Sequence, residues 1–169
     1  MESNSLAHDP LIYRFLPNFT APCSYGSLGV QTGVQCWADA SDPFHVSNFE
    51  DPKVSVNASS QFSSLPGETP YFPPNTLAAI PGPFQLVVVA WRSPVDGFVN
   101  VTGTFTVLQP GTNGVIWSVD KGSTTLKSAL LLSGSSSFSL RKVQVNKDDV
   151  LYFTVDPNGD FNGDNRLFR

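Results

Sequence analysis

The amino-acid sequence predicts an all-β protein built as an antiparallel β-sandwich, in one domain that covers residues 1–169. Between residues 85 and 168 the chain repeats short segments of alternating apolar residues, each followed by a turn that contains Gly, Asn or Ser. Such a repeat is typical of antiparallel strands with one buried and one wet face. No long segment keeps a helical period between capping residues. The chain is long enough to bury roughly 70% of the surface that its unfolded form exposes.

The part of the chain before residue 85 is expected to be mostly irregular. Residues 1–10 are expected to form a flexible tail, and Leu11–Leu16 is predicted to be a first strand that Pro17 ends. The long segment Ala21–Pro83 contains many prolines, and within it only Lys53–Asn57 alternates like a strand. Its aromatic residues indicate that it packs against the sandwich, because disordered linkers are depleted in them. Long irregular segments of compact domains are often functional.

The next two predicted strands differ in their patterns. Gln85–Arg92 is apolar at consecutive positions, so we expect a central strand that is covered on both faces. Phe98–Val107 alternates instead, with one face made of Val99, Val101, Phe105 and Val107 and the other of Asn100, Thr102, Thr104 and Thr106. The first face therefore belongs to the core and the second is wet.

The C-terminal strands follow at short intervals. Residues 120–123 are predicted to form a tight hairpin between Val115–Val119 and Thr125–Leu132. Along Ser137–Asn146 the apolar positions shift phase by one residue, which predicts a β-bulge. Val150–Asp156 is the last clearly alternating strand.

The composition points away from nucleic acids and membranes as partners. The net charge is −4, and the few Lys and Arg residues are scattered, so no basic face is expected that could neutralise phosphates or acidic lipids. The longest apolar run, Leu86–Trp91, is far shorter than the ~20 residues that span a bilayer. The first ten residues lack the features of a secretory signal peptide. The chain is therefore either cytosolic or an excised module, and its low charge and many turn residues favour an excised module of an extracellular or cell-surface protein. Cys23 and Cys36 are expected either to form a disulfide or to be two separate buried thiols.

A longer motif begins at Ala90 and continues to Phe105. It contains the pair Trp91-Arg92, the turn Pro94-Val95-Asp96-Gly97 and the strand Val99-Asn100-Val101-Thr102-Gly103-Thr104-Phe105. A hairpin over residues 115–126 follows, and then the strand Asp149–Asp156, which leads into a loop rich in Asn, Gly and Asp. This order, over most of the chain, resembles the jelly-roll modules of bacterial secreted and cell-surface multidomain proteins. Upstream, Cys23-Ser24-Tyr25-Gly26 resembles the Trp-Ser-Tyr-Gly of these modules, with Cys23 in place of the aromatic residue.

The resemblance implies a jelly-roll strand order and a carbohydrate-binding module, which holds an attached enzyme or adhesin on polysaccharide without catalysis. Sugars stack their apolar C–H faces on aromatic rings and need nearby polar groups that read their hydroxyls. Trp37, Tyr25 and Tyr71 lie in segments expected to be irregular, so they are the predicted ligand-binding residues. For Trp37, a ring that anchors the long loop is an equally weighted alternative. Trp91 and Trp117 share the phase of the apolar strand residues and are predicted to be core residues.

The loop after Val155 is the predicted metal site. Ca²⁺ takes six to eight oxygen ligands, and Asp156, Asn158, Asp160 and Asp164 supply carboxylate and amide oxygens within a few residues. The loop is not an EF-hand, because Phe161 and Leu167 occupy the positions where that loop needs Gly and Glu. The alternative is that these residues only form turns. If calcium binds here, we expect a structural role.

Catalysis is not expected. His8 and His45 are the only histidines, and the known signatures of a nucleophile elbow, a zinc-protease helix or a phosphate-binding loop are missing. A small hydrolase that uses loop carboxylates is the third-ranked alternative. The second-ranked alternative to a carbohydrate-binding module is a structural or adhesive cell-surface protein without sugar specificity.

Overall fold

The computed structural model describes residues 34–38, 53–58, 60, 62, 73–82, 86–108, 113–159 and 166–168. These residues form strands and turns, and no helix occurs among them. The strands are β1 Val34–Ala38, β2 Lys53–Asn57, β3 Thr76–Ile80, β4 Val87–Arg92, β5 Gly97–Val107, β6 Val115–Lys121, β7 Thr124–Leu131, β8 Ser135–Val145, β9 Val150–Asp156 and β10 Arg166–Phe168. No helix in the described ranges is long and apolar enough to cross a membrane. The predicted all-β fold is confirmed for this part of the chain.

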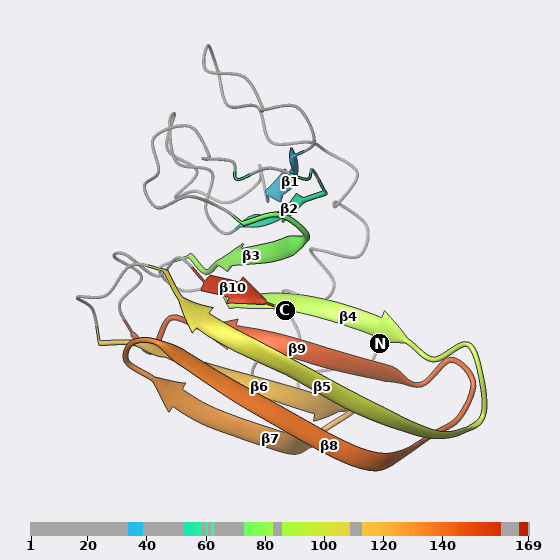
Figure 1. Cartoon of the computed structure of the whole chain (residues 1–169). Helices are drawn as coiled ribbons and strands as arrows, with labels where there is room; N and C mark the ends of the chain where they lie inside the picture. Colours follow the sequence, from blue (N-terminus) through green and yellow to red (C-terminus); the bar gives the residue numbers. More distant parts are fainter. Residues whose placement is uncertain are drawn as a thin grey trace.

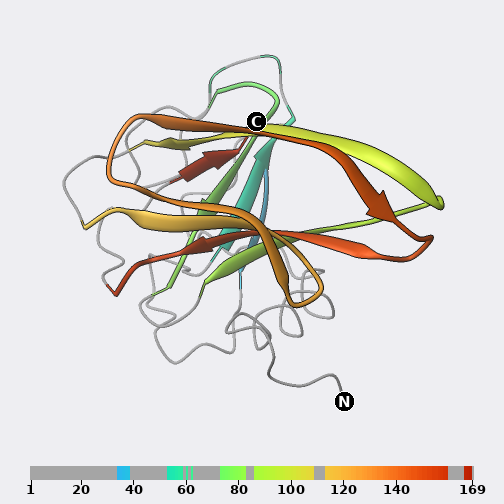
Figure 2. The same ribbon diagram turned by 90° about the horizontal axis from the view of Figure 1, so that it is seen from below.

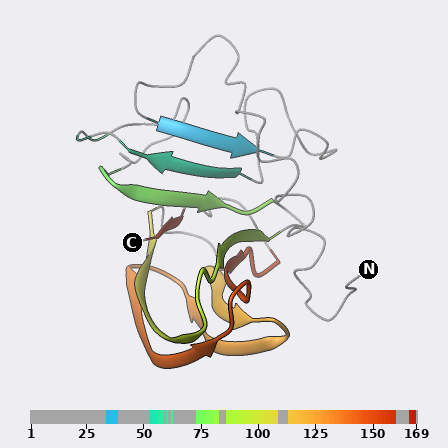
Figure 3. The same ribbon diagram turned by 90° about the vertical axis from the view of Figure 1, so that its right-hand side faces the viewer.

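The strands form two antiparallel sheets (Figure 1). The first has the order β1-β2-β3-β10-β5-β8, and the second has the order β4-β9-β6-β7. Figure 2 shows β5 and β8 in one layer and β6 and β9 in the other, as in a sandwich. Figure 3 shows β1, β2 and β3 side by side, where they extend the first sheet away from β5. The chain therefore has a sandwich-like arrangement of antiparallel sheets.

The core lies between the facing sides of the two sheets. Trp117 of β6 is 0% exposed and stacks on Phe105 of β5, with ring centroids 4.6 Å apart. Phe138 of β8 lies 5.7 Å from Phe105 and 5.6 Å from Trp117 between centroids. Aromatic pairs at these distances add to the hydrophobic stabilisation of the core. Two sequence predictions are thereby confirmed: Trp117 is a core residue, and Phe105 lies on the buried face of its strand.

The predicted β-bulge occurs in β8. Between Val99 and Val101 of β5 the partner residue changes from Val143 to Leu140, so β8 has one residue more than β5 at this point. Lys142 adopts a φ of 55°, and its backbone N–H donates to Oδ1 of Asn100 at 3.0 Å. The extra residue keeps Leu140 and Val143 on the same face of the sheet, which explains the phase shift in the sequence.

The predicted hairpin is confirmed as well: β6 and β7 pair across a turn in which Gly122 has a φ of 56°.

Two sequence predictions about strands are wrong. Gln85–Arg92 was expected to be a central strand, but β4 lies at one edge of the four-stranded sheet as described. Its first residues, Val87 and Val88, are buried on both faces, whereas the second half of the strand is exposed. A run of apolar residues shows that a strand can be buried, but it does not show how far along its length the neighbouring sheet extends.

The segment Ala21–Pro83 is also less irregular than expected. It contains β1 and β3 in addition to the predicted strand β2. β3 has the sequence Thr-Leu-Ala-Ala-Ile, in which the two alanines have low strand propensity and interrupt the alternation. Pairing with β2 and β10 in the sheet outweighs this local preference. Residues 1–10 and Leu11–Leu16, predicted as a tail and a strand, lie outside the described residues.

Candidate functional site

The predicted ligand-binding aromatic residues are only partly within the described residues. Trp37 lies in β1, where it pairs with Val54 of β2, so its backbone is in a strand and not in an irregular segment. Tyr25 and Tyr71 lie outside the described residues, as does Cys23. A binding site formed by these three aromatic residues stays a prediction.

The predicted calcium loop begins with a turn held by its own side chains. Oδ1 of Asp156 accepts a hydrogen bond from the backbone N–H of Asn158 at 2.8 Å, and Asn158 has a φ of 53°. Nδ2 of Asn158 donates to the carbonyl of Asn113 at 3.1 Å, and Nδ2 of Asn113 donates to the carbonyl of Asn158. The side chains of Asp156 and Asn158 therefore act as turn formers, which is the alternative to calcium binding that the sequence left open. Asp160 and Asp164 lie outside the described residues. Among the described residues, no group of three His, Cys, Asp or Glu side chains is close enough to hold a metal ion. Calcium binding stays a prediction.

The outer face of β5 and β8 presents paired hydroxyl groups. Three cross-strand pairs lie opposite one another: Thr102 with Ser139, Thr104 with Ser137, and Thr106 with Ser135. The hydroxyls of Thr104 and Ser137 are 2.9 Å apart, and those of Thr106 and Ser135 are 2.8 Å apart. Threonine fits a strand well, and Thr–Ser hydrogen bonds across strands stabilise the pairing. We call these residues the hydroxyl pairs.

The hydroxyl pairs keep unused hydrogen-bonding capacity. A hydroxyl has one donor and two acceptor positions, so a pair that makes one hydrogen bond retains one donor and three acceptor positions. Ser135, Ser137 and Ser139 are exposed, as is Thr102. In the pairs Thr104–Ser137 and Thr106–Ser135 the mutual hydrogen bond holds the side chains in place before a ligand arrives, which lowers the entropy that binding costs.

An aromatic ring and an amide continue the same row along β5. Phe98 and Asn100 share the outer face with Thr102, Thr104 and Thr106, because residues two apart in a strand point the same way. Phe98 is 69% exposed, and Asn100 is exposed with its side-chain oxygen fixed by the bulge. The β5 row, as we call these five residues, extends over about 27 Å at about 3.4 Å per residue. It carries no ionisable side chain.

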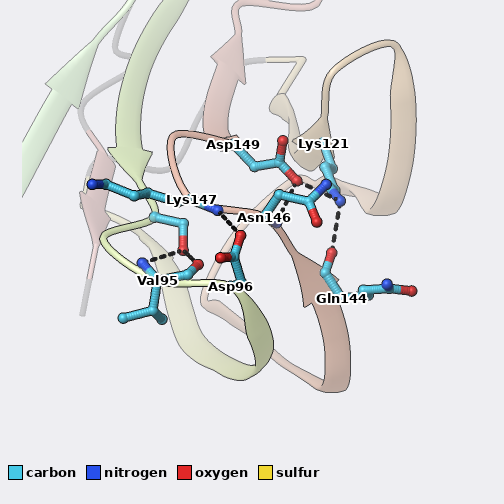
Figure 4. A network of polar contacts seen from close by, with 8 residues as sticks. Val95, Asp96, Lys121, Gln144, Asn146, Lys147 and Asp149 are labelled. Carbon is cyan, nitrogen blue, oxygen red and sulfur yellow. Dashed lines mark hydrogen bonds and ion pairs between the residues drawn. The ribbon is translucent and has the colours of Figure 1, made fainter.

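A polar network fixes the end of the sandwich beside Phe98 (Figure 4). Lys121 at the end of β6 donates from Nζ to the carbonyl of Gln144 in β8 at 2.6 Å, so it links the two sheets. The same Nζ forms an ion pair of 2.9 Å with Asp149. Oδ2 of Asp149 also accepts from the backbone N–H of Asn146 at 2.8 Å, and this bond, with that to Lys121, holds the pKa of Asp149 below its usual value of 3.8. Because Gln144 lies opposite Phe98, the network supports the strand pair that carries the ring.

The turns at this end are joined to one another. Oδ1 of Asp96, in the turn between β4 and β5, accepts from the backbone N–H of Lys147 in the turn between β8 and β9 at 2.7 Å (Figure 4). The buried Ser93 donates from its backbone N–H to the carbonyl of Asp149 at 2.8 Å, and its hydroxyl donates to the carbonyl of Val95 at 2.7 Å. These bonds give the end of the β5 row a defined position.

A second feature is a hollow of about 420 Å³ between β4 and β5. Its lining comprises Trp91, Val99, Asn100, Val101, Thr102, Leu151 and Phe153. Trp91 is 38% exposed, so the prediction that it is a core residue is wrong. Its phase is nevertheless that of the core, because it pairs with Leu151, which is 1% exposed. The phase sets the direction of a side chain, whereas burial also needs a neighbouring strand above it. We call this feature the β4–β5 hollow.

A buried carboxylate lies on the opposite side of the second sheet. Asp120 is 1% exposed; its Oδ2 accepts from the hydroxyl of Ser118 at 2.5 Å and its Oδ1 from that of Thr125 at 2.6 Å. Ser118 also bonds to the hydroxyl of Thr154. Each of these polar groups has a hydrogen-bond partner, so the cluster is an arrangement of satisfied buried polar groups.

Sequence reasoning missed Phe98 as a site residue. The alternation of Phe98–Val107 contained the signal, because Phe98 has the phase of Asn100 and Thr102 and not that of the core residues. An aromatic residue on the solvent-facing side of a strand is a candidate contact for a ligand.

Comparisons of the chain with protein families, with curated proteins and with solved structures find no match.

Proposed function

We propose that this chain is a non-catalytic carbohydrate-binding module of the jelly-roll type, which acts outside the cell or at the cell surface. Its ligand is a neutral polysaccharide, which lies along the outer face of β5 and β8. The observation that supports the proposal is the β5 row, in which the exposed ring of Phe98 is followed by an amide and by the hydroxyl pairs.

The chemistry of the row fits a sugar chain. A pyranose ring can place its C–H face on Phe98, and Asn100 and Thr102 offer polar groups at steps of about 6.8 Å along the strand. The β5 row has no ionisable side chain, which suits an uncharged sugar, whereas Arg141 and Lys142 of β8 are exposed at the bulge opposite Asn100. Phe98, Asn100 and Thr102 are exposed, and Thr104 and Thr106 are half-buried, so the open face suits an internal stretch of a polysaccharide.

The first experiment is an array of neutral and acidic polysaccharides, followed by titration calorimetry with the glycan that binds. The variant Phe98→Ala should weaken the affinity about two- to tenfold, because a stacking contact contributes about 0.5–1.5 kcal/mol beyond burial. Leu130→Ala is the matched control: Leu130 is 53% exposed, but it lies in β7 of the other sheet. It should leave the affinity unchanged.

The hydroxyl pairs and the ionic strength provide two further readouts. Ser137→Ala removes one hydroxyl of a pair at an exposed position, and it should weaken binding by a similar factor because a hydrogen bond contributes about 0.5–1.5 kcal/mol. A neutral glycan should bind with little dependence on salt, because it carries no charge that Arg141 and Lys142 of β8 could attract.

Three outcomes would contradict the proposal in different ways. If no polysaccharide binds, the alternative of a structural or adhesive protein without sugar specificity replaces it. If a glycan binds but Phe98→Ala keeps the wild-type affinity, the site lies elsewhere, and variants of Trp37, Tyr25 and Tyr71 are the next to test. Turnover of a polysaccharide would indicate the hydrolase alternative.

A further inference from the structure

The sequence contains the acceptor motif for N-linked glycans, Asn-x-Ser/Thr, and the structure places two of its asparagines in very different surroundings. Asn57, which begins Asn57-Ala58-Ser59, is 0% exposed in β2, a strand that pairs with β1 and β3. Asn100, which begins Asn100-Val101-Thr102, is exposed on the outer face of β5. A glycan is bulky and has to project into solvent. Of these two asparagines, only Asn100 has room for one.

The side-chain amide of Asn100 is held so that its nitrogen remains available. Oδ1 accepts the backbone N–H of Lys142 at the bulge of β8, at 3.0 Å. Because the oxygen and nitrogen of a planar amide point in different directions, Nδ2 points away from this N–H group. Within the part of the chain that the structure describes, no hydrogen bond engages Nδ2. Nδ2 is the atom that an N-linked glycan modifies.

The neighbours of Asn100 on the outer face suit an attached sugar. Phe98 and Thr102 flank it at steps of about 6.8 Å along the strand, and all three side chains point the same way. The ring of Phe98 is 69% exposed, and a pyranose stacks its C–H face on such a ring. A sugar on Nδ2 therefore has an aromatic ring on one side and a hydroxyl group on the other.

We propose that Asn100 is the acceptor of an N-linked glycan whose first sugar stacks on Phe98. The donor is an oligosaccharide joined to a lipid through a diphosphate, and the enzyme is an oligosaccharyltransferase of the secretory pathway. Nδ2 forms a bond to C1 of the first sugar, the bond between C1 and the diphosphate breaks, and the lipid diphosphate leaves with the electron pair. Nδ2 loses one proton to a base of the transferase, and nothing is oxidised or reduced.

The modification has a consequence that rests on the proposed function. A glycan on Asn100 occupies the β5 row between Phe98 and Thr102, which are the residues that polysaccharide would contact. The modified chain therefore does not bind polysaccharide along the row, and the unmodified chain does. Glycosylation of Asn100 selects between these two forms.

The test measures which asparagines carry a glycan in a secreted chain. The whole chain is secreted from a eukaryotic cell behind a cleavable signal, with Asn18→Gln, because the third triplet, Asn18-Phe19-Thr20, lies outside the described residues. An amidase that releases N-linked glycans leaves Asp at each modified position, and peptide mass spectrometry gives the occupancy. Asn100 should be occupied in most secreted chains. Asn57 should be unoccupied, because a glycan there prevents β2 from packing between β1 and β3.

Two variants of Thr102 test the motif in the folded chain. Thr102→Val removes the hydroxyl that the motif requires, but Val suits a strand, so the variant should fold and lose the glycan. Thr102→Ser keeps a hydroxyl and should keep the glycan. Both variants should retain the far-ultraviolet circular dichroism of the wild type. An unoccupied Asn100, an occupied Asn57, or equal occupancy in Thr102→Val and the wild type would overturn the acceptor site.

Urea unfolding tests the contact with Phe98. The glycosylated chain should have an unfolding midpoint about 0.3–0.7 M higher than the same chain made in bacteria without a transferase, because the sugar stacks on the ring. This shift should disappear in Phe98→Ala. It should persist in Leu130→Ala, where the truncated side chain is 53% exposed in β7 of the other sheet. A shift of equal size in Phe98→Ala would show that the sugar does not stack on this ring.

Polysaccharide binding is measured separately on the two forms of the chain. A polysaccharide that binds the unmodified chain should bind the glycosylated chain at least about tenfold more weakly. Equal affinities would show that the ligand does not lie along the row at Asn100, and they would contradict the placement of the ligand in the proposed function. Occupancy of Asn100 is read from peptide masses, so it is decided even if no polysaccharide binds.

Discussion

Replacement of Trp117 by Ala should be among the most destabilising single substitutions in the described part of the chain. The ring is 0% exposed and contacts both Phe105 and Phe138, at centroid distances of 4.6 and 5.6 Å. Truncation of a buried Trp to Ala costs about 3–5 kcal/mol through lost transfer free energy and the cavity that remains. Among the described residues, Nε1 of Trp117 has no hydrogen-bond partner. Loss of this unpaired N–H offsets part of the cost, so we expect a loss of about 3 kcal/mol.

Urea unfolding, followed by circular dichroism, measures the effect. With a denaturant slope of about 2 kcal/mol per molar for a domain of this size, a loss of about 3 kcal/mol lowers the unfolding midpoint by about 1.5 M. Trp117→Phe should lower it less, because it keeps an aromatic ring against Phe105 and removes the unpaired N–H.

Ile116→Ala is the control that tests which face of β6 is buried. Ile116 is adjacent to Trp117 but faces the other way and is 40% exposed, so its truncation should shift the midpoint by less than about 0.5 M. Equal shifts for Trp117→Ala and Ile116→Ala would refute the assignment of β6 faces on which the core description rests.

Three further predictions concern the turns and loops. The folded-state pKa of Asp149 is lowered, first by the bond from the Asn146 N–H and then by Lys121, so its contribution to stability is present above the unfolded-state pKa and is lost as pH falls through the folded-state pKa. Urea midpoints taken from neutral to strongly acidic pH should therefore fall less steeply in Asp149→Asn, and an identical slope in variant and wild type would contradict this. Gly114→Ala should destabilise by more than about 1 kcal/mol, because φ is +80° and the added Cβ would lie 2.7 Å from the carbonyl oxygen of Leu131. Gly122→Ala, where the Cβ has open space, is the comparison in the same urea assay and should cost less. If the loop that begins at Asp156 holds calcium, EGTA should lower the melting temperature, by an amount that corresponds to about 2.7 kcal/mol at a hundredfold excess of free ion over Kd. An unchanged melting temperature would leave the residues of this loop as turn formers.

Much of the C-terminal half could be predicted because its strands are local patterns. The alternation in β5, the hairpin between β6 and β7 and the bulge in β8 each follow from the spacing of a few residues. These features depend on which face a side chain points to, and a period of two residues fixes that direction from the sequence alone. The same period placed Trp117 in the core.

The candidate site was less accessible to prediction. The sequence already placed Asn100 and the threonines on the wet face of β5, but the serines of the hydroxyl pairs come from β8, about 30 residues later. Only the register between β5 and β8 places Ser137 opposite Thr104 and Ser135 opposite Thr106. Phe98 could have been found from its phase, yet its exposure depends on which segments cover that face of the sheet, and the structure leaves it 69% exposed.

The sequence by itself determined the all-β class, the boundaries of most C-terminal strands and the direction of their side chains, because these follow from turn residues and a two-residue period. Only the tertiary structure decided which strands became edges and how far each neighbour extends. The phase of Trp91 is that of a core residue, but β4 is an edge strand of its sheet as described, and the ring is 38% exposed. Burial depends on what lies above a side chain, and that is set by contacts between segments far apart in the chain.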